Sequence, residues 1–251
     1  YCSTSGGLGD VYKRQKQYGA TFLVFTDYAR NAVRLSALMG LPNIFVYTHD
    51  SVALGEDGPT HQPIEHIVTL RSTPNLNNWR PADLVETAVA WKNAVCSKIT
   101  PTCLIFSRQG TSAIGRTQEQ ISAIEMGGYL LKEKKDNDIT IVASGSEVQL
   151  ALDAAKELEN KSINVNVVSM PSLDIFLQQS SEYQKMVIDP DKPVLVVECA
   201  HPNSWYKILN RSDKVLGIET FGESAPGGEL LEHFGFNKEK VIQAAKSLID
   251  D

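Results

Sequence analysis

The sequence predicts an α/β fold, arranged as two consecutive three-layer α/β domains with mainly parallel sheets. Short apolar segments, such as residues 44–47 and 139–143, alternate along the chain with longer stretches of helical periodicity. This alternation is typical of parallel sheets covered by helices. A polar stretch without apolar rhythm, residues 109–120, is expected to be a linker between a domain at 16–108 and a second domain at 121–251.

In the first domain, the signals for helix ends are clear. Thr26 or Asp27 caps the first helix, and Gly40 ends it. Pro63 occupies the first turn of the next helix, where its missing N–H removes no hydrogen bond. The expected elements are helices at 27–39, 63–71 and 81–97, and strands at 44–47, 79–80 and 102–107.

The second domain shows the same alternation of strands and helices. Its first strand-to-helix turn is a candidate binding site. Ser144, Gly145 and Ser146 lie between a strand and a helix. Free backbone N–H groups there predict an anion site, while the serines alone predict a simple helix cap; both interpretations stay open. The expected elements are strands at 139–143, 165–169, 194–198 and 215–218, and helices at 147–160, 229–236 and 238–248.

Composition excludes several classes of function. The net charge is −6 and no basic run occurs, which argues against nucleic acid and anionic membranes as partners. No apolar stretch approaches the roughly 20 residues that span a bilayer. The four cysteines are scattered, and the three with apolar neighbours are expected in the core. With no signal-peptide pattern at the start, we expect a cytoplasmic protein.

Residues 47–63 form the segment richest in chemistry. They carry His49 and His61 together with three carboxylates, and glycines and prolines that exclude a helix or strand interior. The segment follows a buried strand, which is where open α/β sheets place ligand crevices. A solvated polar loop is the alternative interpretation. Histidines beside carboxylates suit proton transfer near neutral pH, whereas their spacing indicates no metal site.

The first fifteen residues have neither helical nor strand periodicity. Residues 10–15, Asp-Val-Tyr-Lys-Arg-Gln, match the translation of a transposon-end sequencing adapter, GATGTGTATAAGAGACAG. We therefore expect residues 1–15 to be non-native and the native sequence to start near Lys16.

The motifs of both halves resemble those of transketolase, in order from about residue 17 to the C-terminus. The resemblance implies a pyrimidine-binding domain that lacks its beginning, followed by a C-terminal domain. The motifs that carry it are Tyr-Gly-Ala-Thr-Phe at 18–22, Thr-His-Asp-Ser at 48–51, Gly-Glu-Asp-Gly-Pro-Thr-His-Gln-Pro at 55–63, Trp-Arg-Pro-Ala-Asp at 79–83, Ser-Arg-Gln at 107–109, Ala-Ser-Gly-Ser-Glu-Val at 143–148, Val-Ser-Met-Pro at 168–171 and Phe-Gly-Glu-Ser-Ala-Pro at 221–226.

This resemblance implies transfer of a two-carbon ketol unit from a ketose phosphate to an aldose phosphate, in the pentose phosphate pathway. The cofactor would be thiamine diphosphate, with Mg²⁺ or Ca²⁺ held by an N-terminal domain. Phe22, Phe25 and Tyr28 would wall the aminopyrimidine ring of the cofactor. His61 would act near the cofactor amino group and the substrate carbonyl, and His49 would line the substrate channel as a second catalytic residue.

Substrate contacts follow from the same resemblance. Asp57 would hydrogen-bond a sugar hydroxyl, and His49 and His61 would contact the sugar phosphate. Arg108 would bind the phosphate, which suits its permanently charged, planar guanidinium; an ion pair at a strand end is the alternative interpretation. Glu198, Cys199 and His201 are expected to be structural.

The resemblance also indicates what this chain does not contain. The metal motif and the catalytic glutamate of the family have no counterpart in it, and no metal ligand is assigned. We expect the whole enzyme to be a homodimer acting on sugar phosphates and the isolated chain to be inactive. The alternatives are the C-terminal subunit of a split transketolase and a non-catalytic α/β protein that binds thiamine diphosphate.

Overall fold

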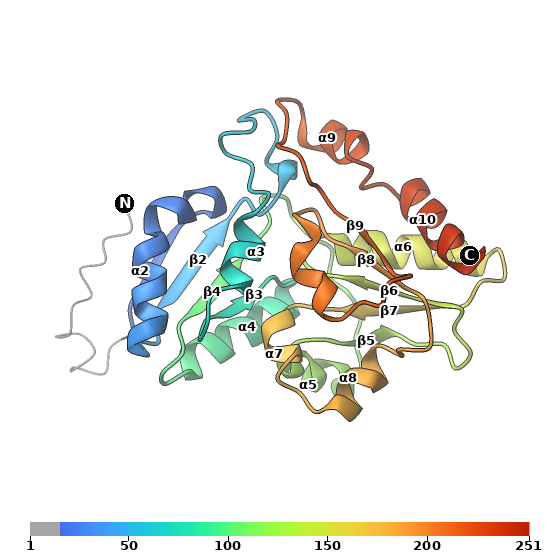
Figure 1. The fold of residues 1–251 in the computed structure, drawn as a ribbon, viewed down its shortest axis with the longest axis horizontal. Coiled ribbons are helices and arrows are strands. Elements are labelled where there is room, and N and C mark those ends of the chain that lie inside the picture. Colours follow the sequence, from blue (N-terminus) through green and yellow to red (C-terminus); the bar gives the residue numbers. More distant parts are fainter. Residues whose placement is uncertain (1–15, 251) are drawn as a thin grey trace.

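The computed structural model describes residues 16–250, which form two α/β domains lying side by side (Figure 1). The first domain has a sheet with strand order β1-β2-β4-β3, in which every pair is parallel. Its elements are β1 (Tyr18–Phe22), η1 (Leu23–Phe25), α2 (Thr26–Met39), β2 (Ile44–Thr48), η2 (Val52–Leu54), α3 (His66–Arg71), β3 (Asn77–Trp79), α4 (Leu84–Cys96) and β4 (Thr102–Ile105).

The second domain has a sheet with strand order β5-β7-β6-β8-β9. Only β5 is antiparallel to its neighbour among these strands. Its elements are α5 (Gln118–Ala123), η3 (Ile124–Met126), β5 (Tyr129–Lys132), β6 (Ile139–Ala143), α6 (Glu147–Glu159), β7 (Val165–Ser169), α7 (Leu173–Phe176), α8 (Ser181–Val187), β8 (Val194–Val197), η4 (Pro202–Lys207), β9 (Lys214–Leu216), α9 (Gly227–His233) and α10 (Lys238–Asp250).

The central strands of each sheet are buried on both faces, which confirms the prediction of three-layer domains. Alternate residues of a strand point to opposite faces. Phe45 and Tyr47 of β2 therefore pack with α2 and α3, whereas Ile44 packs on the opposite face with α4. In the second sheet, Ile141 faces α6 and α10, and Val142 faces α7 and α8.

Several element boundaries differ from the predictions, and local hydrogen bonds explain them. Helix α4 starts at Leu84, because the Asp83 carboxylate accepts hydrogen bonds from the backbone N–H groups of Val85 and Glu86, both at 3.1 Å. Helix α5 begins inside the expected linker, because Thr117 forms a capping box with Gln120. The same signature, Thr-x-x-Gln, is visible in the sequence.

The sequence pattern missed β1 and misplaced the end of β3. The pattern did not predict β1, whose short segment gains its hydrogen bonds only by pairing with β2. Strand β3 ends at Trp79, because the Arg80 N–H donates to the Pro171 carbonyl at 2.7 Å instead of continuing the sheet.

Two of the cysteines meet the expectation of core burial. Cys103 and Cys199 are buried, whereas Cys96, at the end of α4, is exposed, which corrects the expectation for that residue. The prediction for residues 1–15 lies outside the described residues. Among residues 16–250, no helix combines the length and the apolar composition that crossing a membrane requires.

Parallel strands bring their carboxyl ends to the same edge of a sheet. In the first sheet this edge carries Phe22 at the end of β1, His49 after β2 and Arg80 after β3. In the second sheet the corresponding positions are Ser144 after β6 and Glu198 after β8. Since Arg80 hydrogen-bonds to Ser144 at 3.0 Å, the two edges meet between the domains.

Candidate functional site

Aromatic rings gather where β1 leads into α2. Phe22 ends β1, Phe25 ends η1, and Tyr28 lies in the first turn of α2. The Phe22 and Phe25 rings are stacked with centroids 5.9 Å apart, and the Phe25 and Tyr28 rings are tilted at 5.8 Å. Because Tyr28 is 88% exposed, the cluster presents an aromatic surface on which a planar heterocycle could stack.

His49 joins this cluster from the end of β2. Its imidazole stacks on Phe22 with centroids 3.8 Å apart, and its Nδ1 lies 2.9 Å from the Thr48 hydroxyl. The backbone of His49 has φ 61°, in the left-handed region that a non-glycine residue adopts only when its surroundings hold it there. The structure therefore fixes His49 more tightly than an ordinary loop residue.

The electrostatic surroundings of His49 favour its neutral form. Partial burial lowers the pKa of His49, and the positive charge of Arg108 lowers it further, while Asp57 and Asp50 oppose the shift. A neutral imidazole can accept a proton or a hydrogen bond. The charges that act on His49 thus come from Arg108, in the segment after β4, and from Asp57, in the loop.

Replacing Arg108 with glutamine should raise the pKa of His49. The positive charge that opposes protonation is lost, while Asp57 and Asp50 still favour it. NMR titration of the histidine ring signals measures this shift. Lys92→Gln serves as the control. It also removes a positive charge, but Lys92 is paired with Glu125 and is not among the charges that shift the pKa of His49. A His49 pKa that stays the same or falls in the Arg108 variant would contradict this placement.

His61 reaches the same surface from the other end of the loop. Its ring meets the Phe25 ring edge-on with centroids 5.4 Å apart, and its Nδ1 lies 2.9 Å from the Thr60 hydroxyl. The structure thus brings together His49, His61 and the three aromatic residues. Asp57 and Arg108, whose charges act on His49, are both exposed, and within residues 16–250 Arg108 makes no ion pair.

Next to the candidate site lies a network of buried charged residues that the sequence did not predict. Arg80 is 1% exposed and lies 2.7 Å from the Asp50 carboxylate, next to His49. Its guanidinium also forms an ion pair with Glu147 and lies 3.8 Å from Glu198. Burial alone would lower the pKa of Arg80, but the carboxylates, Glu147 foremost, raise it well above its usual value.

Glu198 links this network to a second arginine. Its carboxylate accepts hydrogen bonds from Arg71 at 2.7 and 2.8 Å and from the Trp205 indole N–H at 2.6 Å. Burial would raise the pKa of Glu198, but the charge and hydrogen bonds of Arg71, with Arg80, lower it to about 2. Glu198 therefore stays ionised in the interior and has a structural role.

The turn after β6 is contacted by Arg80 of the first domain. Arg80 donates to both the carbonyl and the hydroxyl oxygen of Ser144 at 3.0 Å. Ser146 occupies the N-cap position of α6, but its hydroxyl donates to Glu147 at 2.7 Å and does not cap the backbone. Neither interpretation of this turn from the sequence anticipated an arginine from the other domain.

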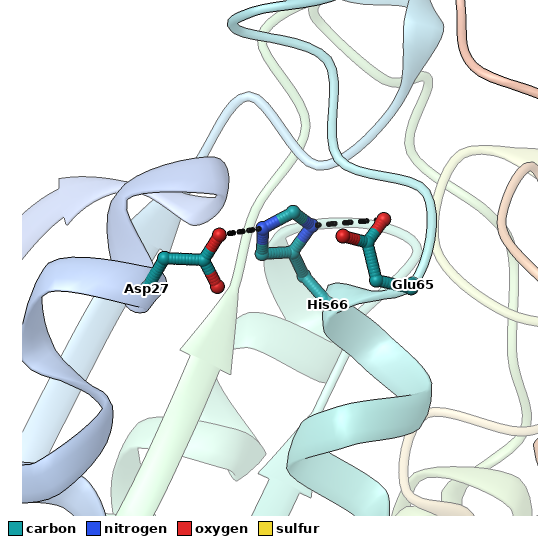
Figure 2. Close-up of side chains that lie close together, drawn as sticks. All are labelled: Asp27, Glu65 and His66. Atoms are coloured by element: carbon teal, nitrogen blue, oxygen red, sulfur yellow. Dashed lines mark ion pairs between the residues drawn. The ribbon is translucent and has the colours of Figure 1, made fainter.

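Among the described residues, one further group could offer metal ligands: Asp27, Glu65 and His66 (Figure 2). His66 is 5% exposed; its Nε2 lies 3.3 Å from Asp27 and its Nδ1 3.8 Å from Glu65. The two carboxylates lie on opposite sides of the imidazole ring in Figure 2. One ring nitrogen and one oxygen from each carboxylate lie within 4.8 Å of one another, and the ion pairs of His66 link Asp27 of α2 to Glu65 at the start of α3.

Comparison with known proteins identifies both domains. Residues 10–112 match the transketolase pyrimidine-binding domain, and residues 127–237 match the transketolase-like C-terminal domain. Transketolase 2 of Vibrio parahaemolyticus is 50% identical over 234 residues, which are 92% of this chain and 35% of that protein. Transketolase 1 of Aliivibrio fischeri is also 50% identical over 234 residues, which are 92% of this chain and 35% of that protein. The chain thus spans about a third of the length of these relatives.

Solved structures agree with this assignment. A mutant of Pichia stipitis transketolase superposes with a TM-score of 0.87 at 44% identity, covering 93% of this chain and 34% of that chain. A split-gene transketolase, described as an inactive β4 tetramer, has a TM-score of 0.73 at 26% identity, covering 93% of this chain and 76% of that chain. The chain therefore belongs to the transketolase family, of which it contains the pyrimidine-binding and C-terminal domains.

Proposed function

We propose that this chain forms part of an enzyme that transfers a two-carbon ketol unit from a ketose phosphate to an aldose phosphate. The observation that carries the proposal is the convergence of the aromatic cluster with His49 and His61 at one sheet edge. The family points to thiamine diphosphate as the cofactor. When bound, thiamine diphosphate supplies the carbanion chemistry and stores the electron pair.

The aromatic residues would position the cofactor. Phe25 offers a ring face between Phe22 and Tyr28, and stacking there would orient an aminopyrimidine. His61 lies edge-on to Phe25, so its imidazole would hold or move a proton beside a pyrimidine stacked on Phe25. Mg²⁺ or Ca²⁺ would bind in an N-terminal domain and is not assigned to residues of this chain.

The polar residues would bind the sugar phosphate. Arg108 would pair with the phosphate group, and neutral His49 would accept a hydrogen bond from a substrate hydroxyl. Asp57 would accept a hydrogen bond from a sugar hydroxyl near the reacting carbon. This contact would favour the stereoisomer whose hydroxyl points toward the carboxylate. The enzyme would act as a cytoplasmic homodimer in the pentose phosphate pathway.

A chimera tests the proposed function. Residues 16–251 of this chain replace the matching part of Vibrio parahaemolyticus transketolase 2, which is 50% identical. We expect the chimera to convert a ketose phosphate and an aldose phosphate with thiamine diphosphate and Mg²⁺. A folded, dimeric chimera that binds the cofactor without any turnover would refute the proposal and favour a non-catalytic, cofactor-binding role.

The 251-residue chain alone should show no turnover, because no residue in it is assigned to the metal site or the catalytic glutamate. A subunit role is the second candidate, favoured by the similarity to one chain of a split-gene transketolase. Mixing the chain with a separate N-terminal, diphosphate-binding chain tests it. Activity restored by mixing would favour the subunit role, whereas activity found only in the covalent chimera would favour a single polypeptide.

A further inference from the structure

The loop that carries both histidines, residues 49–63, is bordered by the second domain and is called the site loop below. At its start, Asp50 follows His49 directly and is 1% exposed. Its carboxylate accepts a hydrogen bond from Arg80 Nε at 2.9 Å, and the Arg80 guanidinium is held in turn by Ser144 and Glu147 of the second domain. The start of the site loop is thus connected to α6 through one buried arginine.

The end of the site loop has a separate attachment. Gln62 follows His61 directly and is 2% exposed. Its amide nitrogen donates two hydrogen bonds at 2.8 Å, one to the Gly55 carbonyl within the loop and one to the Glu223 carbonyl of the second domain. The Gln62 side chain therefore closes the loop on itself and binds it to the segment that precedes α9.

That segment, residues 222–227, is called the clamp segment, and it runs beside the site loop at the top of Figure 1. The Ser224 hydroxyl donates to the Glu56 carbonyl at 2.6 Å. At Gly227, an added Cβ would lie 2.5 Å from the Ala53 carbonyl oxygen. The clamp segment therefore contacts the site loop at its middle as well as at Gln62.

Gly222 makes the closest approach. A Cβ at position 222 would lie 1.7 Å from the Gln62 side-chain oxygen and 2.8 Å from its amide carbon. The backbone of Gly222 does not have the left-handed conformation that requires glycine, so the space taken by Gln62 is what excludes a side chain. Any larger residue at this position must displace the amide group of the Gln62 side chain, which holds the site loop through its two hydrogen bonds next to His61.

We propose that the second domain positions the site loop, and that Gly222 and Gln62 are the positioning residues for His61. This inference rests on the proposed function for its catalytic meaning, but the geometry it concerns belongs to the chain itself. The second domain would then act in the reaction without touching the substrate, by fixing where the His61 imidazole lies relative to Phe25.

The histidine ring signals of the chain provide a direct test. The sequence has five histidines, so isotope labelling of histidine gives a small, assignable set of NMR signals. In Gly222→Ala, we expect the His61 signals to shift while those of His66, which is paired with Asp27 and Glu65, stay in place. Gly228→Ala is the matched control, because no atom lies within 4 Å of a Cβ at that position; it should shift none of the five.

A double substitution shows whether the effect passes through Gln62. Gln62→Ala alone should shift the His61 signals, because both hydrogen bonds of the amide are lost. Adding Gly222→Ala to Gln62→Ala should cause no further shift, since the colliding side chain is gone. This comparison also carries the test if Gly222→Ala by itself fails to fold. Additive shifts, or an unchanged His61 signal in folded Gly222→Ala or Gln62→Ala, would overturn the proposal.

Kinetics of the chimera give the functional readout. Gly222→Ala should lower kcat roughly 10- to 100-fold with a smaller change in KM, because small misplacements of catalytic groups are costly. Gly228→Ala should match the unsubstituted chimera. If the unsubstituted chimera has no activity, the proposed function fails, while the NMR comparison still decides whether the clamp segment positions His61. Wild-type kcat in folded Gly222→Ala would overturn the positioning role.

Discussion

Arg80→Met should reduce the free energy of unfolding by about 3–5 kcal/mol, the usual cost of removing one partner from a buried ion pair. Arg80 is 1% exposed and is paired with Asp50, Glu147 and Glu198. Methionine fills a similar volume but leaves these carboxylates without their shared cation. Chemical denaturation at neutral pH measures the loss.

Lys92→Met is the control for this prediction. Lys92 also forms an ion pair, with Glu125, but its side chain is 65% exposed, and surface pairs contribute little to stability. We expect its unfolding curve to overlay that of the wild type. If Arg80→Met also left the unfolding curve unchanged, the buried network would contribute nothing to the free energy of unfolding. The connection between Asp50 and the second domain would then not stabilise the fold.

His61→Ala should reduce the kcat of the chimera roughly 100-fold or more, the usual contribution of a positioned general acid or base. KM should change much less, because the imidazole is proposed to act on a proton during the reaction. Stability should be nearly unaffected, since the described contacts of the ring are the Phe25 edge and the Thr60 hydroxyl. Initial rates and unfolding curves of the same preparation separate the two effects.

His233→Ala is the matched control for His61→Ala. His233 lies on α9 with its side chain 59% exposed, and its ion-pair partner is the exposed Glu223 carboxylate at 3.8 Å, a surface pair that contributes little. Among the described residues, its ring contacts Phe234 and none of the rings of the aromatic cluster. Its removal should leave both kcat and KM unchanged. Equal kcat values for the two variants would show that His61 has no part in the chemistry, and would leave His49 as the candidate for proton transfer.

The site loop illustrates how far the sequence could be interpreted. Its glycines, prolines and polar residues, placed after a buried strand, correctly indicated a loop at the carboxyl end of the sheet. The resemblance then selected His49, His61 and the aromatic residues, and the structure places their rings in contact. The roles of these residues in binding and catalysis stay predictions, which the chimera experiments address.

Arg80 illustrates what local patterns could not reveal. In the sequence it stands in a Trp-Arg-Pro motif at the end of a short strand, and nothing nearby shows that it is buried. Its partners Asp50, Glu147 and Glu198 lie 30, 67 and more than 100 residues away in the chain. A buried arginine is stable only where such partners converge, so its role becomes visible only in the folded molecule.

The sequence by itself determined the α/β class, most helices and strands, and the residues that follow each strand, because periodicity and turn chemistry act over a few neighbouring residues. Only the tertiary structure decided how the second domain holds the site loop. Gln62 and Glu223 are 161 residues apart in the chain and hydrogen-bonded at 2.8 Å in the fold. Contacts of this kind depend on the packing of whole domains, which no local pattern encodes.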